Sequence, residues 1–243
     1  MTIDPQAAKH IQLLAGTGFG SMHMLAPAMV REGMRRMVQA LGPGKPVHSV
    51  EDRTIATDTG GLAVRIYRSS AAETRPIMVF FHGGGFVLGD LDTHDGLARS
   101  LAAAADCVVV SVDYPLAPEH KYPAARNSAY AATKWVSTHA AEIGGDPGRL
   151  LVAGDSAGGN LAAVVSLDAR DHGGPRLVHQ VLIYPGTDMR MGWPSLERHA
   201  QQLPLTRAGM HWFVAHYLRN DADKLDWRAS PLARLDLFSE HVH

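Results

Sequence analysis

The sequence predicts an α/β fold in which helices flank a mostly parallel central sheet. Several apolar runs are continuous, which is typical of strands buried on both faces, and Ile77-Met78-Val79-Phe80-Phe81 is the clearest of them. Stretches with helical periodicity lie between these runs, among them the Ala-rich residues 92–105. Because strands and helices alternate along the chain, they are expected to form β-α-β units wound into one sheet.

Residues 4–41 are expected to be helical. Their apolar side chains, most of them methionine, fall at helical spacings: Met22, Met24, Leu25, Met29, Met34, Met37 and Leu41. Such a stripe is usually core packing, but methionine also suits the adaptable wall of a binding site. Two interpretations stay open for this segment, which are a packed core element and a flexible cap over a pocket.

The other elements follow the break at Gly42-Pro43-Gly44-Lys45-Pro46. Residues 47–57 and 62–68 are expected to pair as a hairpin, since the second run alternates apolar and polar residues. Further strands are predicted at 77–81, 107–112, 150–153 and 178–184, and further helices at 92–105, 123–143, 157–170 and 206–219. We expect a single domain, with 1–42 as a helical cap segment and 47–235 as the core.

The composition excludes several classes of protein. Hydrophobic residues make up 46% of the chain and charged residues 19%, so disorder is not expected. The net charge is −1 without any run of Lys or Arg, so neither nucleic acid nor an anionic membrane is an expected partner. No apolar run approaches the ~18 residues of a membrane span, and the first residues lack a secretory pattern. Because Cys107 is the one cysteine and lies in an apolar run, we interpret it as a core residue and expect a cytoplasmic protein.

A nucleophile-elbow pattern follows the predicted strand 150–153. Residues 154–159 read Gly-Asp-Ser-Ala-Gly-Gly, which matches G-x-S-x-G with Ser156 at its centre. A strand that passes through this tight turn into a helix presents the serine hydroxyl at the top of a sheet. Gly154 and Gly158 fit the turn because larger residues beside it would clash. Ser156 is therefore the candidate catalytic nucleophile.

A second glycine cluster, His82-Gly83-Gly84-Gly85-Phe86, follows the predicted strand 77–81. Ester hydrolysis passes through an oxyanion that fixed backbone N–H groups stabilise, and glycine lets the backbone approach it closely. The candidate oxyanion-hole donors are Gly84 with Gly83 or Gly85, and Ala157 after the nucleophile. A flexible turn is the plainer alternative, and a nucleotide loop is disfavoured because G-x-G-x-x-G and a P-loop lysine are absent here. Two such motifs, each at a strand end, favour a hydrolase.

At these motifs the chain resembles the hormone-sensitive-lipase-like esterases of the α/β-hydrolase fold. The matching segments are H-G-G-G-F at 82–86, Asp113 to Glu119, G-D-S-A-G-G-N at 154–160, Tyr184-Pro185 and Ser230-Pro231. The resemblance implies a carboxylic ester hydrolase that acts on small-molecule esters of short or medium acyl chain, with His82 orienting the oxyanion loop. The family usually carries arginine where this chain has Pro115, so a basic side chain that would brace the loop at Glu119 is expected to be lost.

The triad acid and histidine of this family are not found in the chain. A serine needs a base to take its proton and an acid to orient that base, in the family's order Ser, acid, His. The D-P-L-like and H-G-F-like motifs that would supply them are absent after Ser230-Pro231-Leu232. Asp236 or Glu240 with His241 or His243 keeps the order, but these residues lie too close together to come from successive strand ends. The acid and the base therefore stay unassigned.

Other polar residues are given plainer roles. Asp188 follows a strand and is expected to line a pocket or cap a turn. The histidines outside the motifs are expected at the surface or paired in the core: His172, His179, His199, His211 and His216. Because the sequence has no H-E-x-x-H pattern, neither a metal nor another cofactor is expected.

Two functions remain in view. The first is a carboxylesterase, and the second is a truncated, non-catalytic or ligand-binding member of the same fold that lacks the triad acid and histidine. The last strands of the family's sheet are expected to be missing. Residues 178–184 would then form an apolar edge open to pairing with another chain, so a homo-oligomer is one expectation.

Overall fold

A six-stranded mixed sheet forms the centre of the molecule, with the strand order β1-β2-β4-β3-β5-β6. The computed structural model describes residues 4–15, 19–42, 44–71, 74–201 and 205–234. The strands are β1 (Ser49–Thr57), β2 (Gly60–Arg68), β3 (Arg75–Phe81), β4 (Val108–Val112), β5 (Gly145–Asp155) and β6 (His179–Ile183). β1 and β2 form the predicted hairpin and β2 pairs antiparallel with β4, whereas β4, β3, β5 and β6 run parallel. The predicted fold class is therefore confirmed.

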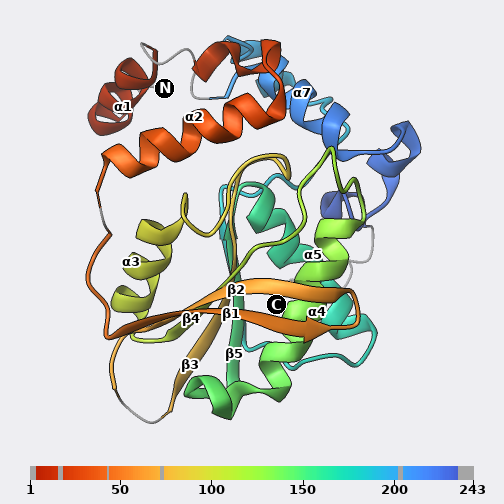
Figure 1. The fold of residues 1–243 in the computed structure, drawn as a ribbon. Coiled ribbons are helices and arrows are strands. Elements are labelled where there is room, and N and C mark those ends of the chain that lie inside the picture. Colours follow the sequence, from red (N-terminus) through yellow and green to blue (C-terminus); the bar gives the residue numbers. More distant parts are fainter. Residues whose placement is uncertain (1–3, 16–18, 43, 72–73, 202–204, 235–243) are drawn as a thin grey trace.

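Helices cover both faces of this sheet (Figure 1). They are α3 (Asp95–Ala105) on one face, and α4 (Ala124–Thr138) and α5 (Ala157–Asp171) on the other. Successive side chains of a strand point to opposite faces, and β3 follows this rule. Ile77 and Val79 pack in the cluster that contains α4 and α5, while Met78 and Phe80 pack against the alanines of α3. The continuous apolar run of β3 is thus explained by burial on both faces.

The N-terminal helices lie together at one end of the molecule, near α7 (Figure 1). They are α1 (Pro5–Ala15), the 3-10 helix η1 (Phe19–Met24) and α2 (Pro27–Ala40), and α7 spans Arg207–Tyr217. η1 packs directly on α7, where the side chain of Met22 is buried. The shorter elements are η2 (Ala140–Ile143), α6 (Pro194–Arg198), η3 (Asp221–Leu225) and η4 (Pro231–Ala233). None of the described helices combines the length and hydropathy that a bilayer span requires.

Three elements differ most from the predicted ranges. The helix expected at 92–105 begins at Asp95, and the helix expected at 123–143 divides into α4 and η2. Gly144 then adopts a φ of 75°, which ends the helical stretch as glycine commonly does. β5 starts at Gly145, five residues before the predicted strand, because Gly145 pairs with Arg75 of β3. The start of β5 depends on pairing across the sheet, which periodicity alone does not report.

β6 lies at the edge of the sheet within the described residues, where it pairs with β5 alone. Its flanking residues Val178 and Tyr184 are exposed, which agrees with the expected open edge at 178–184. At the centre of the sheet, Phe81 at the end of β3 is opposite Gly154 near the end of β5. The loops that follow these two parallel strands therefore start side by side, and they carry both sequence motifs.

Candidate active site

Ser156 occupies a strained turn between β5 and α5. Its φ of 52° and ψ of −113° lie in a region that residues with side chains rarely adopt. Two hydrogen bonds hold this conformation, since the Ser156 amide donates to the Ile183 carbonyl at 2.9 Å and the Gly186 amide donates to the Ser156 carbonyl at 3.1 Å. The strand–turn–helix geometry expected of a nucleophile elbow is therefore present at this serine.

The glycines on either side of the elbow are required by space. A Cβ atom on Gly158 would overlap the backbone carbonyl of Phe81, and one on Gly154 would overlap the carbonyl of Gly158. The backbone atoms of a packed strand and helix cannot move aside as a flexible side chain can. This packing brings the start of α5 directly against the end of β3, where the second glycine cluster begins.

The loop after β3 closes into a tight turn over residues 84–88. The carbonyl of Gly84 accepts hydrogen bonds from the amides of Val87 at 3.1 Å and Leu88 at 2.8 Å. Gly84 has a φ of 121°, which only glycine adopts readily, and Gly85 has a φ of 61°. Within the described residues, the amides of Gly84, Gly85 and Ala157 donate to no protein group. Unpaired amides at such a position are suited to bind a developing negative charge.

Gly83 differs from its two neighbours. Its amide donates to the Oδ1 atom of Asp155 at 2.8 Å, and the Asp155 side chain is buried. A side chain on Gly83 would overlap this carboxylate. The Gly83 amide already holds the loop against Asp155, so among the candidate donors Gly84, Gly85 and Ala157 are the ones whose amides stay free within the described residues.

His82 is fully buried beneath the same loop. Its Nδ1 atom lies 2.8 Å from the Gly83 carbonyl, and its ring stacks on Tyr114 with 4.3 Å between the centroids. The Tyr114 hydroxyl donates to the His82 carbonyl at 2.6 Å. Burial lowers the pKa of His82 to about 4, so the ring is neutral at pH 7. These contacts are those of a side chain that orients a loop, as the resemblance implies.

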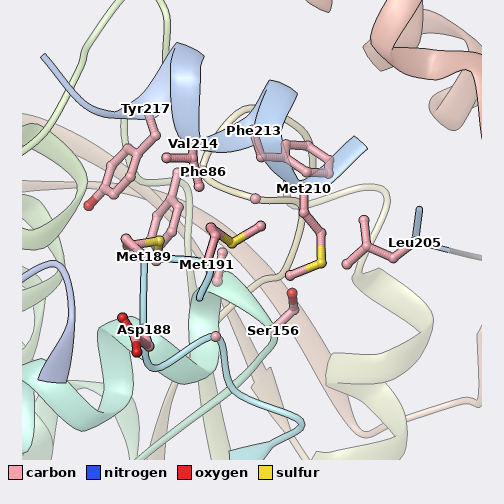
Figure 2. Close-up of a pocket in the computed structure, with 13 residues that line it drawn as sticks. Phe86, Ser156, Asp188, Met189, Met191, Leu205, Met210, Phe213, Val214 and Tyr217 are labelled. Carbon is pink, nitrogen blue, oxygen red and sulfur yellow. The ribbon is translucent and has the colours of Figure 1, made fainter. Parts of the chain in front are cut away.

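An apolar cavity of about 90 Å³ opens beside Ser156 (Figure 2). Its lining residues come from the oxyanion loop, the elbow, the segment 186–191 and the α7 region: Gly85, Phe86, Ser156, Ala157, Gly186, Asp188, Met189, Met191, Leu205, Met210, Phe213, Val214 and Tyr217. In Figure 2 the Ser156 side chain points toward Met210 at the edge of this space. Such a cavity accepts an apolar group attached to the atom that the serine attacks.

The methionines of this cavity are not those of the N-terminal segment. Among the described residues, the lining methionines are Met189, Met191 and Met210, whereas Met24 and Met29 are 77% and 61% exposed. Within the described residues, the N-terminal methionines do not line this cavity, and the cap interpretation of residues 1–42 stays a proposal. The N-terminal segment instead supports α7, which supplies the wall. Sequence spacing did not reveal this because the contact joins residues nearly two hundred positions apart.

Asp188 lines the cavity but is fully engaged. Its carboxylate accepts from the Arg190 amide at 2.9 Å, from the Arg190 guanidinium at 2.8 Å and from the Trp193 indole at 3.0 Å. Hydrogen bonding to Arg190 lowers the pKa of Asp188, so this group stays ionised. The predicted roles of pocket wall and turn cap are both present in the structure.

No histidine lines the cavity within the part of the chain that the structure describes. His172 and His216 bond to helix carbonyls, at Asp168 and Trp212, and His179, His199 and His211 are exposed. Asp236, Glu240, His241 and His243 lie outside the described residues. The geometry thus places Ser156 beside unpaired amides, and it leaves the base unassigned.

Two motif residues have supporting roles that their sequence pattern does not predict. Asn160, one turn into α5, donates to the carbonyls of Gly186 at 2.7 Å and Ala229 at 2.8 Å. Ser230 accepts from the Met189 amide at 2.9 Å, so the Ser-Pro segment braces the wall beside Ser156. A buried asparagine in a small-residue helix is the signal that indicates such a role.

The expected loss of a brace at Glu119 is also wrong. Pro115 carries no charge, but Arg31 of α2 pairs with the Glu119 carboxylate at 2.8 Å. The basic side chain therefore comes from the N-terminal helices. Only the three-dimensional fold reveals this substitution of one source of charge for another.

Comparisons with known proteins agree with this architecture. A family model described as the alpha/beta hydrolase fold matches residues 78–241. Esterase LipI of Mycobacterium tuberculosis is 50% identical over 175 residues, which cover 70% of this chain and 54% of LipI. An ethyl acetate hydrolase of Pseudomonas putida is 34% identical and covers 96% of this chain and 76% of its own length. A solved hyperthermophilic esterase from the archaeon Pyrobaculum calidifontis superimposes with a TM-score of 0.88 at 40% identity, covering 96% of this chain and 76% of that one.

These matches fix the class of the protein as an α/β-hydrolase. More narrowly, the chain belongs to the hormone-sensitive-lipase-like esterase family of that fold. It spans about half the length of the mycobacterial relatives, with 54% of LipI and 55% of the carboxylic ester hydrolase LipN covered.

Proposed function

We propose that this protein hydrolyses carboxylic esters of short or medium acyl chain, with Ser156 as the nucleophile. The observation that carries the proposal is the position of Ser156, strained at an elbow, beside an apolar cavity that the unpaired amides of Gly85 and Ala157 also border. The names of the relatives, esterases and an ethyl acetate hydrolase, support the same reaction.

In this reaction the Ser156 Oγ atom attacks the acyl carbon, and the carbonyl oxygen becomes an oxyanion. The amides of Gly84, Gly85 and Ala157 would donate to that oxygen, and the positive N-terminal end of α5 adds to the stabilisation. The alcohol leaves with a proton, and water then attacks the acyl-enzyme and releases the acid. The apolar cavity would hold the acyl group, since its walls carry few polar atoms.

The proton of Ser156 needs a base, which stays unassigned. A second candidate function follows from the absence of a histidine in the described lining of the cavity, namely a non-catalytic, ligand-binding member of the family. A triad without its base retains only the catalysis due to the oxyanion hole and binding, on the order of 10³–10⁴-fold above water.

The test is the hydrolysis of p-nitrophenyl acetate and butyrate by the chain and by its Ser156→Ala variant. We expect the wild-type rate to exceed that of the variant by at least about 100-fold. Equal rates would overturn the esterase proposal and favour the binding protein. The difference between the two rates defines the Ser156-dependent rate.

Adding imidazole to both proteins then reports on the base. Imidazole that raises the Ser156-dependent rate identifies a site whose base is missing, because it supplies the proton acceptor from solution. A Ser156-dependent rate that imidazole leaves unchanged identifies a base within the chain. The Ser156→Ala variant corrects for the hydrolysis that imidazole itself causes.

We keep three further predictions as proposals: the division into a cap segment 1–42 and a core 47–235, association of copies into a homo-oligomer, and a cytoplasmic location. The open edge of β6 supports the second, and the single buried Cys107 supports the third.

A further inference from the structure

Arg31 reaches from the N-terminal helix α2 into the core behind the oxyanion loop. Its Nε atom donates to the Val87 carbonyl at 2.7 Å, and its Nη2 atom donates to the Ala117 carbonyl at 2.7 Å. The side chain is only 16% exposed, although it belongs to a surface helix. A guanidinium that is largely removed from water and bonded to two main-chain carbonyls holds a defined position.

Both carbonyls belong to backbone that shapes the candidate oxyanion hole. Val87 closes the turn 84–88, since its amide bonds to the Gly84 carbonyl. Ala117 is tied to the same turn, because its amide donates to the Phe86 carbonyl at 2.9 Å. Through Val87 and Ala117, Arg31 therefore holds the turn that carries the unpaired amides of Gly84 and Gly85.

Glu119 fixes the guanidinium from its remaining side. Nη1 donates to Oε1 at 2.9 Å and Nη2 donates to Oε2 at 2.8 Å, so the pair is bidentate. Arg31 holds the pKa of Glu119 at about 2, so the carboxylate stays charged at neutral pH. A lysine could not replace this arrangement, because a single ammonium cannot present planar, forked donors to a carboxylate and two carbonyls at once.

A second contact of α2 lies at the end of the same loop. Arg35 donates to Asp90 at 2.6 Å, and Asp90 in turn accepts from the Thr93 amide at 2.8 Å. The Arg35 side chain is 46% exposed, so its contribution is smaller than that of Arg31. The two contacts together attach one helix of the N-terminal segment to the loop at two points, Val87 and Asp90.

We propose that Arg31 is a positioning residue for the oxyanion hole: it holds the turn 84–88 in the shape that leaves the Gly84 and Gly85 amides free to bind the oxyanion. The inference rests on the proposed esterase function. It links the N-terminal segment to the chemical step, in addition to the support that this segment gives to the pocket wall through α7.

Hydrogen exchange tests the structural part without requiring activity. We expect the protected amides of Val87, Leu88 and Ala117 to exchange about tenfold faster in Arg31→Gln. In this variant the Val87 and Ala117 carbonyls lose their hydrogen bonds to the Arg31 guanidinium. The matched control is Arg36→Gln, since Arg36 lies on the same helix but pairs only with Glu32 one turn away at 2.8 Å. Unchanged exchange of these amides in Arg31→Gln overturns the inference, whatever the hydrolysis rates are.

Steady-state kinetics tests the catalytic part. Arg31→Gln is expected to lower the Ser156-dependent kcat about tenfold with KM changed less than about twofold, because a displaced hole weakens transition-state binding alone. A raised KM with an unchanged kcat would contradict the positioning role. Arg31→Lys is expected to resemble Arg31→Gln, and Glu119→Gln to show a smaller loss because the two carbonyl bonds remain.

These variants also separate the two proposals. A wild-type chain without Ser156-dependent hydrolysis would overturn the proposed function, while faster exchange at Val87 and Leu88 would still support Arg31 as the anchor of the turn. Should Arg31→Gln fail to fold, Glu119→Gln provides the same exchange measurement with a milder change.

Discussion

The two sides of Ser156 are built in different ways. On the oxyanion side, residues 82–89 and 154–158 pack closely. A Cβ atom would overlap main-chain atoms at Gly84, Gly154 and Gly158, and side-chain atoms at Gly83 and Gly85. On the cavity side, segment 186–191 and α7 present methionine, leucine and phenylalanine side chains. The close packing on the oxyanion side allows one arrangement, whereas the side chains on the cavity side can adopt many.

The difference indicates how the site divides its tasks. Backbone amides aimed at an oxyanion must stay fixed, because stabilisation falls steeply when they move. A wall of methionines adapts to acyl groups of different shape at little cost, because the side chain is flexible and polarisable. Under the proposed function, the rigid side would govern whether an ester reacts, and the adaptable side would govern which ester fits.

The largest effect that separates the two sides is expected from Gly158→Ala. Its Cβ would meet the Phe81 carbonyl, so β3 or α5 must shift and stability should fall by more than about 3 kcal/mol. Gly33→Ala on α2 is the control, since nothing lies within 4 Å of its Cβ and it should gain up to about 1 kcal/mol. Urea unfolding followed by circular dichroism measures both, and equal midpoints would contradict the account of the rigid side.

The next largest expected effect is a dependence of the free energy of unfolding on pH, which arises from His82. Unfolded, this histidine has a pKa near 6.5, while burial lowers the folded pKa to about 4. Between these values the unfolded chain binds a proton that the folded chain does not, so the free energy of unfolding falls as the pH falls. The loss is on the order of 3 kcal/mol across the window.

The measurement is the slope of unfolding free energy against pH from 7 to 4 for wild type and His82→Gln. The variant should lose this part of the slope, whereas His211→Gln, on the exposed face of α7, should keep it. Parallel slopes for wild type and His82→Gln would show that His82 is not held neutral by burial.

The smallest effects are expected on the cavity side. Phe213→Ala removes the ring that packs on Gly85, and should shift the ratio of hexanoate to acetate hydrolysis about tenfold toward the longer chain. Met210→Leu conserves volume and should change either rate less than about threefold. A large loss for both esters in Met210→Leu would show that this wall is as rigid as the opposite one.

The sequence predicts the rigid side well. Ser156, the glycine clusters and the strand before each cluster follow local rules, and parallel pairing of β3 with β5 brings the two motifs together. The sequence predicts less of the hydrogen bonding. The bond from the Gly83 amide to Asp155, for example, depends on the orientation of one carboxylate.

Local sequence patterns do not predict the cavity wall or the contacts that Arg31 makes. The wall formed by Met189, Met191 and Met210 and the reach of Arg31 to Val87 and Glu119 join segments far apart in the chain. Spacing within one helix identifies its apolar face, but it does not identify the partner of that face. Within the described N-terminal helices, Met22 packs on α7, whereas Met24 and Met29 are exposed.

The central claim is that Ser156 is a nucleophile beside a preformed oxyanion hole. The most direct measurement is mass spectrometry of the chain after treatment with a p-nitrophenyl alkylphosphonate, which phosphonylates an activated serine. We predict one adduct per chain, located on the peptide that contains Ser156 and absent from Ser156→Ala. No adduct on that peptide, or equal labelling of the Ser156→Ala variant, would contradict the claim.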